Sequence, residues 1–206
     1  MSSPIGKLHL ILGPMFSGKT TKLIEIYNEN QEKNKQVIAI NYDADRRYHD
    51  SMLSTHDKVM IPCIFTESIA EILQHPSITS ANIILINEGQ FFPDIYEAVL
   101  MLVEQHGKTV YICGLDGDFQ RNRFGDLLSL IPFCDSVVKL TARCNLCNEP
   151  AIFSRRITCE TAQVVIGSTN YIPVCRACYH VSNPIVQPLE VVTVEEADRD
   201  GFDISL

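Results

Sequence analysis

The chain has 206 residues, of which 46% are hydrophobic, and its formal net charge is −8 with a pI of about 5.2. This length suits one medium-sized domain with a small appendage. The negative charge argues against a nucleic-acid backbone as the main ligand, and no run of eighteen apolar residues predicts a membrane span. Residues 1–7 lack the apolar core of a signal peptide, so we expect a cytoplasmic protein with no nucleic-acid or membrane partner.

The most informative stretch follows an apolar strand predicted over residues 8–12. It reads G-x-x-x-x-G-K-T, a pattern in which two glycines let backbone N–H groups turn toward phosphate oxygens. Lys19 would reach the β- and γ-phosphates, Thr20 would offer its hydroxyl to Mg²⁺, and a helix predicted over residues 21–32 would direct its positive end at the anion. The alternative is a strand that ends in an ordinary glycine turn. We predict an ATP-like site formed by Gly13, Pro14, Met15, Phe16, Ser17, Gly18, Lys19 and Thr20.

Three further apolar runs, at residues 37–40, 83–86 and 110–113, are too short for helices and typical of strands buried on both faces. A helical pattern begins after Asp94 and ends at Gly107. Alternating strands and helices predict an α/β fold, a P-loop NTPase-like parallel sheet flanked by helices. Ligands of such a sheet bind at the carboxyl ends of its strands.

Glu88 lies at one of these strand ends, directly after Asn87. A carboxylate there can hold Mg²⁺ or its waters, or accept a proton from the attacking group. The alternative is an ordinary charged residue in a turn between a strand and a helix. The place beside the phosphate loop favours a functional role, but spacing alone does not tell whether the attacking group is water or a substrate hydroxyl.

Two C-x-x-C pairs, Cys144 with Cys147 and Cys175 with Cys178, predict one structural Zn²⁺ site with four thiolate ligands. Two disulfides or four buried thiols are the alternatives, and disulfides are rare in a reducing compartment. The other four cysteines show no ligand spacing and are expected to be buried or incidental: Cys63, Cys113, Cys134 and Cys159.

The segment between the cysteine pairs is interpreted as a hairpin. Its strands are predicted over residues 151–156 and 163–167, with 158–162 as the connection. Residues 168–171 would then form a loop that is free to fold over a ligand. After this segment, residues 190–206 are acidic with no apolar stripe and are expected to be frayed.

These motifs, in this order, resemble the type II thymidine kinases of the cellular and poxviral type, from about Lys7 to Tyr179. Besides the phosphate loop and the cysteine pairs, the matching segments are Thr55-His56-Asp57, Glu88–Ile95, Leu115-Asp116-Gly117, Phe119-Gln120-Arg121, Phe124-Gly125 and Ser136–Ala142. The resemblance implies ATP-dependent phosphorylation of thymidine or deoxyuridine at the 5′-hydroxyl, giving dTMP and ADP from thymidine in deoxynucleotide salvage. It also implies a homotetramer, Mg²⁺ with ATP, and dTTP as a feedback inhibitor.

The resemblance further assigns residue roles and domains. Glu88 matches the catalytic base, and Asp45, Arg47 and Gln90 fall near the ATP phosphates. The nucleoside pocket would be formed by Met15, Phe91, Leu115, Phe119, Phe124, Ser154, Gln163, Val164, Val165 and Tyr171, where a lasso-like lid grips the base largely through main-chain groups. The expected domains are a nucleotide-binding domain (1–141), a small zinc-ribbon-like lid domain (142–191) and a flexible tail (192–206).

The chain departs from the family pattern at four places. Asn87 replaces a usual Asp on the Mg²⁺ side, Gln163 replaces an aliphatic residue, Ser154 replaces Thr, and the segment 167–171 is one residue shorter. Three interpretations follow. The favoured one is an active deoxynucleoside kinase, the second is a weakened nucleotide-binding regulator, and the third is a zinc-ribbon ATPase that acts on nucleic acid.

Overall fold

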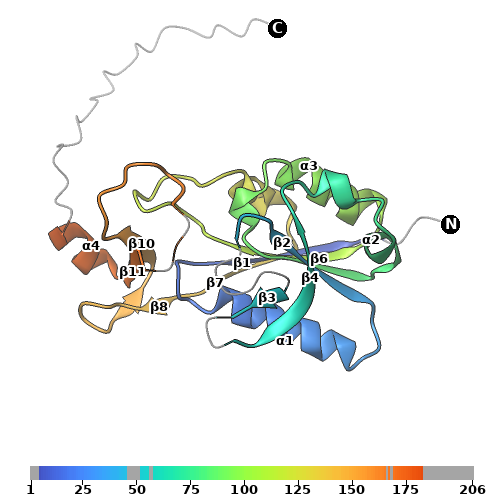
Figure 1. Cartoon of the computed structure of the whole chain (residues 1–206), viewed down its shortest axis with the longest axis horizontal. Helices are drawn as coiled ribbons and strands as arrows, with labels where there is room; N and C mark the ends of the chain where they lie inside the picture. The colour runs from blue at the N-terminus through green and yellow to red at the C-terminus, as the bar shows by residue number, and fades with distance from the viewer. Residues whose placement is uncertain (1–4, 46–51, 56–57, 166, 168, 183–206) are drawn as a thin grey trace, which may run out of the picture.

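A computed structural model describes residues 5–45, 52–55, 58–165, 167 and 169–182. A seven-stranded sheet forms its centre, with helices on both faces (Figure 1). In spatial order, its strands are β3 (Met52–Ser54), β4 (Met60–Thr66), β2 (Val37–Tyr42), β5 (Ile83–Ile86), β6 (Thr109–Gly114), β1 (Lys7–Leu12) and β7 (Ser136–Lys139). All neighbouring pairs are parallel except β3 with β4. The predicted α/β fold is confirmed, with one antiparallel strand at the edge.

The central strand β5 shows why its sequence is an unbroken apolar run. Its four residues are all buried. Ile84 and Ile86 pack into the core layer on one face of the sheet, and Ile83 and Leu85 pack into the layer on the other. Because successive side chains of a strand point to opposite faces, a strand covered on both faces needs an apolar residue at every position.

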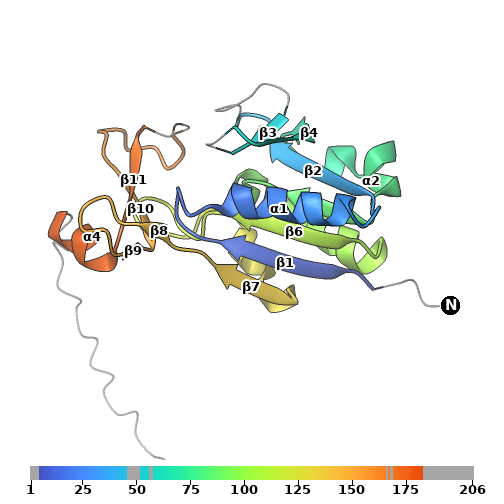
Figure 2. The same ribbon diagram turned by 90° about the horizontal axis from the view of Figure 1, so that it is seen from below.

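Helix α1 (Lys19–Gln31) covers one face of the sheet and buries Leu23 and Ile24 against it (Figure 2). The helix begins after Gly18, whose φ of 82° lies in the left-handed region. A residue with a Cβ would be strained there, which explains the glycine at the end of the phosphate loop.

Helix α3 (Ile95–Leu100) lies on the opposite face and continues as a turn of π-helix, η3 (Met101–Gln105), before Gly107. The helical pattern predicted between Asp94 and Gly107 is confirmed, and four of its apolar residues are buried, namely Ile95, Val99, Leu102 and Val103. The remaining short helices of the sheet region are η1 (Ala70–Ile72), α2 (Pro76–Ser80), η2 (Gly89–Phe91) and η4 (Leu127–Phe133).

Between residues 142 and 182 the described chain forms two small antiparallel sheets and a helix at one end of the molecule (Figure 1). These elements are β8 (Ala142–Arg143) with β9 (Pro150–Ala151), β10 (Phe153–Arg156) with β11 (Tyr171–Val174), and α4 (Arg176–Ser182).

The predicted hairpin is wrong in its second strand. Strand β10 pairs with β11 and not with the described residues 163–165 and 167, and Tyr171 begins a strand instead of lying in a loop. The carbonyl groups of Ala162 and Gln163 accept hydrogen bonds from Arg156 and are not available to a neighbouring strand.

Two further expectations concern the chain as a whole. The division into domains at residue 141 stays a prediction, and the expected flexible tail, 192–206, lies outside the described residues. Within the described ranges, no helix combines the length and the apolar character that crossing a membrane requires.

Candidate active site

A cavity of about 350 Å³ opens where β1, β5 and β6 end, a size that suits a small-molecule ligand. The predicted residues among its lining are Met15, Phe16, Ser17, Gly18, Lys19, Thr20, Glu88, Phe91, Leu115, Phe119, Phe124, Ser154, Gln163, Val164, Val165 and Tyr171. Sequence reasoning assigned no site role to the other lining residues, which are Thr21, Ser54, Thr55, Gly117, Asp118 and Gly167. The cavity therefore joins the phosphate loop to residues far along the chain.

The phosphate loop is shaped for an anion. The Lys19 ammonium donates to the carbonyl oxygen of Pro14 at 2.8 Å, which folds the side chain back over the loop. The Ser17 hydroxyl is buried and has no hydrogen-bond partner among the described residues. Such a group is costly unless a ligand satisfies it, and a phosphate oxygen would do so. From the C-terminal part, the Ser154 hydroxyl accepts a hydrogen bond from the Met15 N–H at 2.9 Å.

Asn87 connects Thr20 to the interior of the sheet. Its Oδ1 accepts hydrogen bonds from the Thr20 hydroxyl at 3.3 Å and from the Cys113 thiol at 2.9 Å. Burial raises the pKa of Cys113 to about 12, so this cysteine remains a thiol and can donate. The Asn87 amide donates to Asn41 Oδ1 at 2.7 Å. Because the Thr20 proton points at Asn87, the lone pairs of the Thr20 oxygen can face a cation, which fits the predicted Mg²⁺ role.

Glu88 lies in the cavity wall in a strained backbone conformation. Its φ of 55° is left-handed, which costs a residue with a Cβ about 1–2 kcal/mol. Gln90 donates to the Glu88 carboxylate at 2.6 Å and accepts from the Leu115 N–H at 2.9 Å. A Cβ on Gly114 would lie 2.6 Å from Gln90 Oε1, so a glycine there makes room for this side chain.

Gly13 and Pro14 of the phosphate loop are buried and do not line the cavity, and three further residues predicted near the phosphates lie elsewhere or outside the described residues. Gln90 is 3% exposed and does not line the cavity, and its amide donates a hydrogen bond to the Glu88 carboxylate. Asp45 is also buried outside the lining, and its carbonyl oxygen accepts a hydrogen bond from Asn41 at 2.9 Å. Arg47 lies outside the described residues.

Aromatic residues form the wall beside Glu88. The rings of Phe91 and Phe124 meet edge to face with centroids 5.4 Å apart, and Tyr42 supports Phe91 at 5.3 Å. Leu115 and Met15 extend this apolar surface toward the phosphate loop. A flat apolar group such as a nucleobase fits against a wall of this kind.

The segment 157–170, which we call the lid, is described at 157–165, 167 and 169–170, and its residues 163–165 and 167 line the cavity. Gln163 donates to Asp118 Oδ2 at 2.9 Å, and Asp118 Oδ1 accepts the N–H groups of Gln120 and Asn122. Asp118 was missed by sequence reasoning because no motif spacing marks it and because its partner Gln163 lies 45 residues further along the chain.

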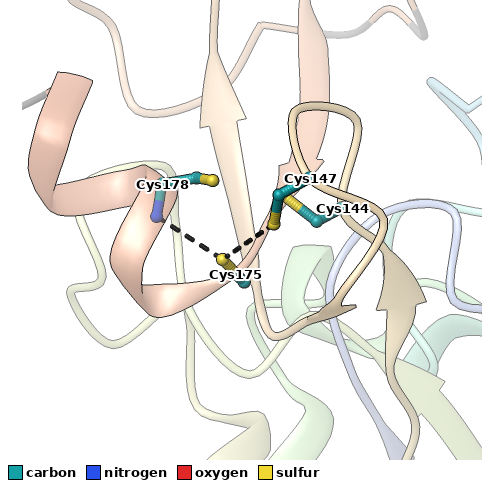
Figure 3. A group of neighbouring side chains, drawn as sticks. All are labelled: Cys144, Cys147, Cys175 and Cys178. Carbon is teal, nitrogen blue, oxygen red and sulfur yellow. Dashed lines mark hydrogen bonds between the residues drawn. The ribbon is translucent and has the colours of Figure 1, made fainter.

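The four predicted metal ligands converge at the base of the C-terminal part (Figure 3). The Sγ atoms of Cys144, Cys147, Cys175 and Cys178 lie within 4.8 Å of one another, and the Cys147 and Cys175 sulfurs are 3.6 Å apart. Tetrahedral zinc with thiolate ligands places sulfurs about 3.8 Å apart, so the cluster fits. Burial acts to raise the pKa of Cys144, but hydrogen bonds at the backbone of Cys175, Leu146 and Cys147 outweigh it and lower the pKa to about 6.

Known proteins are similar to this chain over most of its length. The family model described as "Thymidine kinase" matches residues 6–179. "Thymidine kinase a" of Arabidopsis thaliana is 37% identical over 198 residues, which cover 94% of this chain and 83% of that protein. "Thymidine kinase" of Vaccinia virus (strain Ankara) is 43% identical, covering 84% of this chain and 97% of the viral one. "Thymidine kinase 1" of Dictyostelium discoideum is 42% identical, covering 85% of this chain and 78% of that protein.

Proposed function

The chain belongs to the thymidine kinase family, and we propose that it transfers the γ-phosphate of ATP to the 5′-hydroxyl of thymidine or deoxyuridine. With thymidine the products would be dTMP and ADP, a reaction that serves deoxynucleotide salvage. The observation that carries the proposal is the position of Glu88. It shares one cavity with the phosphate loop and with the aromatic wall of Phe91 and Phe124.

In the proposed reaction Glu88 accepts the proton of the nucleoside 5′-hydroxyl. Gln90 holds the carboxylate through its hydrogen bond of 2.6 Å, so the base is oriented before substrate binds. The phosphate-loop N–H groups and Lys19 balance the negative charge of the transferred phosphoryl group, whose loose transition state needs mainly positioning and electrostatic stabilisation.

Two metals belong to the proposal. Mg²⁺ would be held through Thr20 and the ATP phosphates, and when bound it neutralises charge on the phosphates. Asn87 would orient the Thr20 hydroxyl without adding a negative charge of its own. Zinc would be bound by Cys144, Cys147, Cys175 and Cys178, with no open position for catalysis.

The remaining partners follow from the same site chemistry and from the family. dTTP combines a thymidine group with a triphosphate, so it could fill the nucleoside and phosphate parts of the cavity and act as a feedback inhibitor. We also propose that the protein is a homotetramer in the cytoplasm, without nucleic-acid or membrane partners. The net charge of −8 supports the absence of a nucleic-acid partner.

A phosphate-transfer assay tests the proposed function. The purified protein is incubated with γ-labelled ATP and thymidine, with and without single-stranded DNA, and we expect labelled dTMP independent of DNA. DNA-stimulated release of labelled phosphate would instead support the zinc-ribbon ATPase. Tight ATP binding with no labelled nucleotide would support the regulator.

The Glu88→Gln variant is the matched control for this assay. It keeps the shape and hydrogen-bonding capacity of the side chain but cannot accept the proton, so kcat should fall by about 10²–10⁴-fold while ATP affinity is retained. A Glu88→Gln enzyme with near-normal kcat would show that Glu88 is not the base.

A further inference from the structure

Arg156 is a buried cation at the start of the lid. It is 8% exposed, and its guanidinium carbon lies 3.8 Å from the centroid of the Phe119 ring. It forms no ion pair with a described residue. A buried charge is costly unless hydrogen bonds compensate it, so the groups around Arg156 must supply that compensation.

The compensation comes from the lid and from Tyr171 on β11, although the Nε atom has no hydrogen-bond partner among the described residues. The Arg156 Nη1 and Nη2 atoms donate to four oxygens, which are the carbonyls of Glu160 (2.8 Å), Ala162 (2.5 Å) and Gln163 (3.1 Å) and the Tyr171 hydroxyl (2.5 Å). The Tyr171 hydroxyl then donates to the Val165 carbonyl at 3.1 Å. One side chain therefore sets the direction of the lid main chain at several points, directly or through Tyr171.

This direction decides where the lid N–H groups point. In a trans peptide the C=O of one residue and the N–H of the next are antiparallel, and the described chain has no cis peptide bond. Because the Ala162 and Gln163 carbonyls point at Arg156, the N–H groups of Gln163 and Val164 point away from it. Neither N–H donates to another described residue's backbone, and both residues line the cavity. A ligand edge with carbonyl acceptors, such as a pyrimidine base, could accept from such donors.

We propose that Arg156 is a positioning residue for nucleoside recognition: it orients the main chain of residues 160–165 so that the lid presents hydrogen-bond donors to the base. Its neighbour on β10, Ser154, shares the inward face and contacts the phosphate loop through Met15. Arg156 itself lies outside the cavity lining, and none of its described hydrogen-bond partners belongs to the phosphate loop, so its effect should fall on the nucleoside and not on ATP. The inference rests on the proposed kinase function.

The test compares Arg156→Met with Arg155→Met. Arg155 is adjacent on β10 but points to the opposite face, so its replacement removes the same charge without touching the lid contacts. We expect Arg156→Met to raise the thymidine KM by about tenfold or more, because several charge-assisted hydrogen bonds are lost. The affinity for ATP with Mg²⁺, measured without nucleoside, and the zinc content should stay within about twofold of wild type. Arg155→Met should leave the thymidine KM, the ATP affinity and the zinc content unchanged.

A thymidine KM in Arg156→Met equal to that of wild type would overturn the inference, as would an equal loss of ATP and thymidine affinity. Arg156→Lys retains the cation but offers one donor nitrogen in place of the two, Nη1 and Nη2, that form these hydrogen bonds. Its thymidine KM should therefore lie between those of wild type and Arg156→Met. If Arg156→Met does not fold, the lysine variant decides, and an unchanged thymidine KM in it counts against the inference.

Failure of the proposed function gives a different result. A wild-type protein that phosphorylates no nucleoside refutes the kinase proposal, and the role of Arg156 is then judged by limited proteolysis with thermolysin. Cleavage within residues 157–170 should be faster in Arg156→Met than in Arg155→Met. Equal cleavage rates would overturn the inference independently of any activity.

Discussion

Asn87 stands where the resemblance leads us to expect an aspartate, and its surroundings are matched to an amide. It is 3% exposed, accepts from Thr20 and Cys113 through Oδ1, and donates to Asn41 through Nδ2. Asn41 in turn donates to the Asp45 carbonyl, so its own Oδ1 is held toward Asn87. A carboxylate at position 87 would place an oxygen against that Oδ1 and lose the bond.

We predict that Asn87→Asp has two opposite effects. The added negative charge beside Thr20 should lower the free Mg²⁺ needed for half-maximal rate by about tenfold, the lower end of what changes near a metal produce. The lost hydrogen bond to Asn41 should lower the free energy of unfolding by about 1–3 kcal/mol. A Mg²⁺ titration at saturating ATP and thymidine, together with denaturant unfolding, measures both.

The control is Asn28→Asp, which makes the same charge change at an exposed position on α1. It should leave the Mg²⁺ titration and the stability near those of wild type. Superimposable Mg²⁺ curves for Asn87→Asp and wild type would show that the amide is a tolerated substitution, and the regulator interpretation would then lose its support.

Strand β10 is the element that ties the C-terminal part to the site. Its alternate residues Ser154 and Arg156 are buried, and they contact the phosphate loop and the lid respectively. The cysteine cluster and this strand share one small core, in which Phe153 of β10 and the cysteines Cys144, Cys175 and Cys178 pack together with Val174 and Tyr179. Metal binding should therefore stabilise the strand that carries the lid.

We predict one zinc ion per chain and a structural role for it. Cys144→Ser should lower the zinc content below half an equivalent, raise the thymidine KM several-fold and lower the temperature of unfolding, because zinc binding and local folding are coupled. Metal analysis and thermal unfolding of the purified protein check this. Cys134→Ser, at a cysteine outside both the cluster and the lid, is the matched control. Full activity in zinc-free protein would contradict the prediction.

The elements that sequence could predict are those whose signal is local. The apolar runs predict the central strands, the glycine spacing predicts the phosphate loop, and the C-x-x-C pairs predict the cysteine cluster. The lid shows the limit. Residues 163–165 are rich in β-branched side chains, yet Arg156 binds their neighbouring carbonyls and keeps them out of a sheet. Strand β11 contains Pro173, which disfavours a strand assignment although a two-stranded sheet accommodates it at an edge.

At the scale of the whole molecule, the cavity depends on contacts between distant parts of the chain. Ser154 contacts Met15, Gln163 contacts Asp118, and the Tyr179 hydroxyl donates to the Phe119 carbonyl at 3.0 Å. The roles of Asp118 and Arg156 depend on such contacts with backbone groups, so no motif spacing could reveal them. Glu88 was predictable because strand ends beside a phosphate loop gather at one edge of a parallel sheet.

The central claim is that one cavity holds thymidine and the ATP phosphates on two sides of Glu88. Inhibition by a compound in which adenosine and thymidine are joined 5′ to 5′ through a chain of phosphates tests it most directly. The compound should compete with ATP and also with thymidine, because it would occupy both parts of the cavity at once. Competition with ATP alone, with the thymidine KM unaffected, would place the nucleoside elsewhere and contradict the claim.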